Sequence, residues 1–143
     1  MITIKLYERF EYLSYWFRYQ STYLEMKYHL KQVLNGKEDY YIKPIRHYDR
    51  NIGKSAALAR LSVKYNIPVV VPTHTWKNVI ERDIPRYLPK YFKKKKPTAI
   101  VANRDLRGRR NNVFLVEERL TDEQMDLVNR LYKGHFVGYR NMD

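Results

Sequence analysis

Short apolar runs alternate along this chain with longer segments of helical spacing, and this alternation most limits the folds available to it. The runs at 40–46, 67–71, 98–102, 113–116 and 135–139 resemble strands. The run at 67–71 is largely β-branched, as expected of a strand buried inside a parallel sheet. The segments 54–65, 75–88 and the one that Thr121 opens resemble helices, and Pro85 should distort the last turn of the second. We therefore predict an α/β fold, a mostly parallel sheet flanked by helices.

A longer helical segment precedes the first strand. Its apolar residues recur every three to four positions from residue 6 to residue 34, and no glycine or proline interrupts it before Asn35-Gly36. It is rich in tyrosine, so it either stacks on bases or docks a partner, or packs on the domain with its tyrosines half buried. We predict an N-terminal aromatic-rich helix over 1–38 and a core domain over 39–143.

Composition excludes several classes of protein. The 143 residues suffice for one domain with a real core. The chain has no cysteine, hence no disulfide or thiolate metal site, and its histidines lack metal-ligand spacing. No apolar run approaches a membrane span, and the N-terminus lacks the features of a signal peptide. We expect a protein of the cytoplasm with no membrane partner.

The charge points to a polyanionic partner. A formal net charge of +13 and a pI near 9.9 favour nucleic acid. Two basic clusters could contact its phosphates or simply be solvated surface. They comprise Lys93, Lys94, Lys95 and Lys96, and then Arg104, Arg107, Arg109 and Arg110.

The loop between the first core strand and the next helix carries the candidate chemistry. Backbone N–H groups at a helix N-terminus can cradle a polyphosphate, and Gly53 permits close approach of the backbone. Lys54 would reach the β- and γ-phosphates, and the Ser55 hydroxyl would coordinate Mg²⁺. The candidate nucleotide-binding residues are Asp49, Arg50, Asn51, Ile52, Gly53, Lys54, Ser55 and Ala56. The full phosphate-loop motif would place a glycine where this chain has Tyr48.

An acidic pair supports this interpretation. The apolar run 113–116 ends in Glu117-Glu118. Glu117 would hold the metal, directly or through water, and Glu118 would polarise the attacking water as a general base. The alternative is an exposed strand end that leads into a helix. The loop and the pair together predict a site for ATP and Mg²⁺ in a fold like that of P-loop NTPases.

Arg50-Asn51-Ile52-Gly53-Lys54-Ser55 resembles the Arg-Gln-x-Gly-Lys-Ser/Thr loop of large terminase subunits, the DNA-packaging ATPases of tailed phages. Leu106-Arg107-Gly108, followed by the run that ends in Glu117-Glu118, resembles the corresponding segment of those ATPases and of related helicases. The likeness covers roughly residues 40 to 140. It implies the phosphate and metal roles for Lys54 and Ser55, the Walker B position for Glu117, and the catalytic glutamate position for Glu118. It also implies that Arg50 acts on the γ-phosphate.

The resemblance implies a small phage-encoded ATPase that acts on or beside DNA in the host cytoplasm. A homo-oligomer, or a viral or host protein partner, would fit. One of the arginines between residues 104 and 110 could then complete a neighbouring subunit's site. The chain departs from the family at Glu117, where aspartate is usual, and it has no room for a nuclease domain. The alternative is a non-hydrolysing, basic nucleic-acid-binding or regulatory protein on a degenerate P-loop fold.

Overall fold

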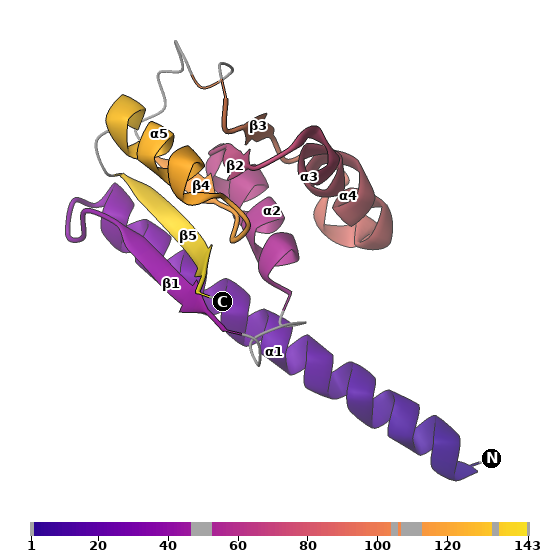
Figure 1. Ribbon diagram of the computed structural model, residues 1–143. Coiled ribbons are helices and arrows are strands. Elements are labelled where there is room, and N and C mark those ends of the chain that lie inside the picture. Colours follow the sequence, from indigo (N-terminus) through magenta and orange to yellow (C-terminus); the bar gives the residue numbers. More distant parts are fainter. Residues whose placement is uncertain (1, 47–52, 104–105, 107–112, 133–134, 143) are drawn as a thin grey trace.

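The computed structural model of the chain describes residues 2–46, 53–103, 106, 113–132 and 135–142, and for 2–15, 131 and 132 it describes the backbone only. Helical and extended segments alternate along these residues (Figure 1). In chain order the elements are α1 (Ile2–Leu34), β1 (Tyr41–Ile45), α2 (Lys54–Tyr65), β2 (Val69–Val71), α3 (His74–Asn78), η2 (Val79–Asp83), α4 (Ile84–Tyr87), η3 (Pro89–Tyr91), β3 (Ala99–Val101), β4 (Phe114–Val116), α5 (Asp122–Tyr132) and β5 (Phe136–Asn141).

The strands form a five-stranded sheet in the order β1-β5-β4-β2-β3, and every pair of neighbours is parallel. The predicted α/β fold with a mostly parallel sheet is confirmed. β1 is an edge strand rather than a central one, and β5 separates it from β4. Because the strands are parallel, β1 and β4 both end at the carboxyl-terminal end of the sheet.

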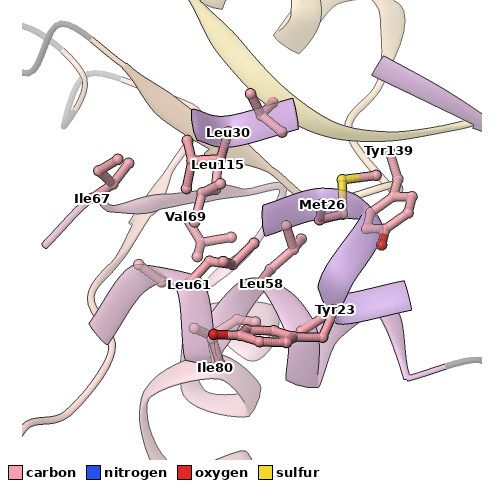
Figure 2. Close-up of a cluster of buried hydrophobic side chains, with 14 of the residues drawn as sticks. Tyr23, Met26, Leu30, Leu58, Leu61, Ile67, Val69, Ile80, Leu115 and Tyr139 are labelled. Carbon is pink, nitrogen blue, oxygen red and sulfur yellow. The ribbon is translucent and has the colours of Figure 1, made fainter. Parts of the chain in front are cut away.

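Alternate residues of the strands face two different helical layers. Val69, Leu115 and Tyr139 belong to one apolar cluster with α1 and α2. Figure 2 shows them beside Leu58 and Leu61 of α2 and Met26 and Leu30 of α1. The opposite set pairs sheet residues with α5, and it includes Val70, Phe114, Val116, Met125 and Val128. The sheet is therefore covered by helices on both faces.

The C-terminal half of α1 is part of the core. Tyr19, Tyr23, Met26, Leu30 and Val33 are buried, and they follow one another at the three- to four-residue spacing of a single helix face. The N-terminal half extends beyond the rest of the molecule (Figure 1). Of the two alternatives for this segment, packing on the domain holds for these buried tyrosines, whereas Trp16, Phe17 and Tyr28 remain exposed.

The helix predicted at 75–88 forms, but its regular turns are interrupted. Thr73 caps it by accepting a hydrogen bond from the Trp76 backbone N–H at 3.3 Å. A π-helical turn then runs over Val79–Asp83, and the α-helix resumes through Pro85. Proline has no N–H and crowds the carbonyl four residues earlier. A wide turn relieves that crowding, so the distortion lies before Pro85 rather than in the last turn.

A capping box starts α5 a few residues after the acidic pair. The Thr121 backbone N–H donates to the Gln124 side chain, and the Gln124 backbone N–H donates to the Thr121 hydroxyl, both at 3.1 Å. Gln124 also donates to the Pro72 carbonyl at 2.9 Å, just beyond β2. These bonds fix the path of the chain as it leaves the β4 end of the sheet.

Candidate functional site

Gly53 positions the start of α2. It is the N-cap residue and has a left-handed backbone, with φ +76°, a region that few residues other than glycine adopt. A Cβ built there would lie 2.7 Å from a ring carbon of Tyr19. The end of the loop thus packs against α1. Glycine suits this position because the backbone is left-handed and because a side chain would collide with Tyr19. The four candidate residues before it, 49–52, lie outside the described residues.

Lys54 and Glu118 meet at the edge of the sheet where the strands end. Lys54 Nζ lies 3.7 Å from Glu118 Oε1, and the two side chains are only 8% and 11% exposed. Lys54 opens α2, whereas Glu118 follows β4 by two residues. The loop lysine and the acidic pair thus lie together, because parallel strands deliver both segments to the same end of the sheet.

Glu117 is the most deeply buried charge in the site, with 1% of its side chain exposed. One carboxylate oxygen accepts the Arg119 backbone N–H at 2.8 Å, and the other accepts the Arg119 guanidinium at 2.6 Å. Burial raises the pKa of Glu117 above its ordinary value, and the hydrogen bonds and charge of Arg119 partly oppose that rise. Arg119 therefore offsets part of the cost of burying the charge of this carboxylate.

Arg119 connects the acidic pair with α3, the helix that follows β2. Its guanidinium also lies 3.1 Å from Glu118 Oε1, and its central carbon lies 3.9 Å from the centre of the Trp76 ring. Neither Arg119 nor Trp76 was predicted from the sequence to be a site residue. The only signal in the sequence was that an arginine directly follows two carboxylates, which does not specify where its side chain goes.

A pocket of about 270 Å³ lies between these groups. We call it the α2 pocket. Its lining comes from the start of α2, from the segment after β4, and from the π-turn region: Gly53, Lys54, Ser55, Ala56, Glu118, Arg119, Val79 and Ile84. The first N–H groups of a helix lack partners within the helix, and its dipole favours an anion there. The pocket thus has helix N–H groups and Lys54 on one side and a carboxylate on the other.

The metal prediction can be tested against these side chains. Among the described residues, no three His, Cys, Asp or Glu side chains are grouped to hold a metal ion. Mg²⁺ does not need such a cage, since it usually binds one or two carboxylates together with phosphate oxygens and water. The predicted ligands Ser55 and Glu117 differ in access: Ser55 lines the α2 pocket, whereas Glu117 is buried against Arg119. The donor set fits a metal that arrives with a polyphosphate.

The predicted nucleic-acid residues are only partly described. Lys93–Lys96 are all exposed. Lys93 and Lys96 line a further pocket of about 400 Å³, the basic pocket, together with Arg82 and Arg86. These two arginines were not among the predicted contacts. The four predicted arginines between 104 and 110 lie outside the described residues.

Comparison of the chain with protein-family models, with curated protein sequences and with solved structures finds no match. The resemblance to the packaging ATPases therefore still rests on the motifs. No helix in the described part of the chain is long and apolar enough to cross a membrane.

Proposed function

We propose that this chain binds a nucleoside triphosphate, ATP with Mg²⁺, in the α2 pocket and hydrolyses it. The observation that carries the proposal is the 3.7 Å approach of Lys54, at the start of α2, to Glu118, beyond β4. A buried lysine, the N–H groups of a helix N-terminus and a carboxylate around one pocket are the groups that phosphoryl transfer uses.

Each side chain has a separate task in this proposal. Lys54 and the N–H groups at the start of α2 hold the phosphates, and the Ser55 hydroxyl contributes a metal ligand. Glu118 orients the attacking water and takes its proton. The metal would neutralise charge on the phosphate oxygens. Arg50, whose position lies outside the described residues, retains its proposed role toward the γ-phosphate.

Binding requires the ion pairs of the site to rearrange. Lys54 and Arg119 both lie within 4 Å of Glu118 Oε1. A polyphosphate would draw these cations toward itself, and the carboxylates would then be open to the metal and the water. Arg119 is 43% exposed, so its side chain has room to leave the acidic pair.

Calorimetry of Mg·ATP binding tests the proposal. Lys54→Ala should weaken binding at least about tenfold, because it removes a charge-assisted interaction with the phosphates. Lys64→Ala is the matched control, because Lys64 is an exposed lysine in the last turn of the same helix. Equal affinity in Lys54→Ala and wild type would overturn the proposed site.

We further propose that the protein acts on or beside DNA, which it contacts through the basic pocket. Three observations support this: the net charge of +13, the exposure of Lys93–Lys96, and the convergence of Arg82 and Arg86 with Lys93 and Lys96. Neutralising phosphates releases counterions, so affinity should fall steeply with salt.

Fluorescence anisotropy with labelled duplex DNA over a salt series tests this second proposal. Lys93→Ala/Lys96→Ala should make the negative slope of log K against log[salt] shallower by about 2. Each lysine that neutralises a phosphate contributes about one to that slope. Lys31→Ala/Lys37→Ala removes the same charge from two exposed positions, one in the last turn of α1 and one just after the helix, and should change the slope less. If the two double variants have the same slope, the salt dependence reflects net charge alone, and the basic pocket is not the contact surface.

One observation favours the non-hydrolysing alternative. Glu117, the proposed metal-side residue, is 1% exposed and both of its carboxylate oxygens accept hydrogen bonds from Arg119. If Arg119 stays in place when nucleotide is bound, the protein binds without efficient turnover. Nucleotide binding with no steady-state phosphate release, with or without DNA, would select this alternative.

A further inference from the structure

A second pocket, larger and aromatic, adjoins the α2 pocket. Its volume is about 610 Å³, and we call it the aromatic pocket. Trp16 and Tyr19 of α1 line it together with Tyr87 and Tyr91, which lie at the ends of α4 and η3. Ala56 and Ile84 line both pockets, so the two pockets are neighbours that share these residues.

The sizes of the two pockets suggest one ligand that spans them. Small-molecule sites usually enclose about 300–1,000 Å³. The α2 pocket, at about 270 Å³, lies just below that range, and the aromatic pocket, at about 610 Å³, lies within it. The smaller pocket has charged walls suited to phosphates, whereas the larger has apolar, aromatic walls suited to a flat ring.

The inner wall of the aromatic pocket is held in place by Arg60 of α2. Its guanidinium donates to the Tyr19 hydroxyl at 3.2 Å, and its central carbon lies 3.9 Å from the ring centres of both Tyr23 and Tyr91. Cation–π contacts of this kind fix ring orientation. Tyr19 and Tyr91 are therefore positioned before any ligand enters.

The outer wall is accessible. Trp16 is 42% exposed and Tyr87 is 80% exposed. An aromatic side chain that is left largely in water gains by stacking on a flat ligand. The pocket thus has a fixed inner wall and two outer rings that a ligand could cover.

We propose that the aromatic pocket binds the base of the nucleotide whose phosphates occupy the α2 pocket, an inference that rests on the proposed function. Among the described lining residues there is no Asn, Gln, Asp or Glu side chain to pair with a base edge. The polar side-chain groups of the lining are Lys90, the Trp16 indole N–H and the tyrosine hydroxyls. Four of its nine residues are aromatic, so the base is held mainly by stacking, which every base permits. Purine triphosphates should bind with similar affinities, and α1 becomes part of the nucleotide site rather than an appendage.

The experiment compares Mg·ATP, Mg·GTP and magnesium tripolyphosphate by calorimetry. Wild type should bind ATP and GTP within about threefold of each other and at least about tenfold more tightly than tripolyphosphate, as expected for base stacking. Tyr87→Ala and Trp16→Ala should each reduce that advantage without changing tripolyphosphate affinity. Tyr28→Ala, which removes an exposed ring from the same helix as Trp16, should change neither.

The outcomes separate this inference from the proposed function. If ATP and tripolyphosphate bind equally, and Lys54→Ala weakens both, the phosphate site stands and the base pocket is wrong. A preference of about 100-fold between ATP and GTP would mean that base edges are read, which also overturns stacking as the basis of recognition. If neither ligand binds, the proposed function fails and the base pocket fails with it.

Discussion

Arg119→Ala should destabilise the protein, because it removes the partner of a buried carboxylate. Arg119 donates a charge-assisted hydrogen bond of 2.6 Å to Glu117, a class that contributes about 1.5–3 kcal/mol. Arg119 is 43% exposed, and solvent screening reduces that contribution to about 1–2 kcal/mol. The cation–π interaction with Trp76, also absent from the variant, adds about 0.5–1 kcal/mol. The expected total of about 1.5–3 kcal/mol corresponds to a fall in Tm of roughly 3–12 °C.

The effect of Arg119→Ala should also depend on pH in a definite direction. Burial raises the pKa of Glu117, and Arg119 opposes that rise, so removing Arg119 should raise the pKa further. A carboxyl whose pKa is higher in the folded than in the unfolded protein destabilises the fold when it is ionised. That cost is present above the folded pKa and disappears as the pH falls through it. The loss of stability in Arg119→Ala should therefore be larger at about pH 7 than at about pH 5.

Urea denaturation followed by far-ultraviolet circular dichroism measures these differences. The matched variant is Glu117→Gln, alone and combined with Arg119→Ala. In the double variant no buried charge is left without its partner, so part of the stability should return at about pH 7. If Arg119→Ala lowers the free energy of unfolding equally at both pH values, and Glu117→Gln restores none of it, the buried-charge argument is wrong.

Two further predictions concern the residues around β4. Glu118→Gln should still bind Mg·ATP while phosphate release falls about 10²-fold or more. Equal turnover of Glu118→Gln and wild type would show that Glu118 takes no part in the chemistry. Glu117→Gln should instead weaken the dependence of the protein on Mg²⁺. Gly138→Ala should destabilise the sheet by more than about 1 kcal/mol, because a Cβ there would collide with the Val116 backbone directly before Glu117. A thermal melt of Gly138→Ala that matches wild type would show that β4 and β5 can separate to admit a methyl group.

The elements of the fold followed closely from sequence periodicity. The helix predicted over 6–34 spans Ile2–Leu34, and the strand predicted over 113–116 spans Phe114–Val116. These segments have strong local signals, since the first lacks any helix breaker and the second is wholly apolar. The order of the strands had no such signal. Pairing β5 between β1 and β4 depends on contacts between distant segments, which periodicity does not encode.

In the candidate site, too, some contacts could be predicted from the sequence and others could not. Lys54 and Glu118 could be expected to meet because each follows a parallel strand, and such strands end at one edge of the sheet. Tyr19 could not be connected with Gly53 in advance. Their contact depends on the angle at which α1 crosses α2, which is set by how side chains of the two helices interdigitate. Arg119 and Trp76 were missed for a similar reason, since their stacking depends on where α3 lies relative to the end of β4.

The seating of Gly53 on Tyr19 links the two ends of the proposed nucleotide site. Tyr19 contacts the glycine that opens α2, and it also lines the aromatic pocket. Arg60, which holds the Tyr19 ring, lies within α2 itself. A shift of α1 along α2 would therefore change the phosphate-side loop and the aromatic wall together. The long N-terminal helix, which sequence alone set apart from the core domain, thus contacts the glycine that opens α2 and lines the aromatic pocket.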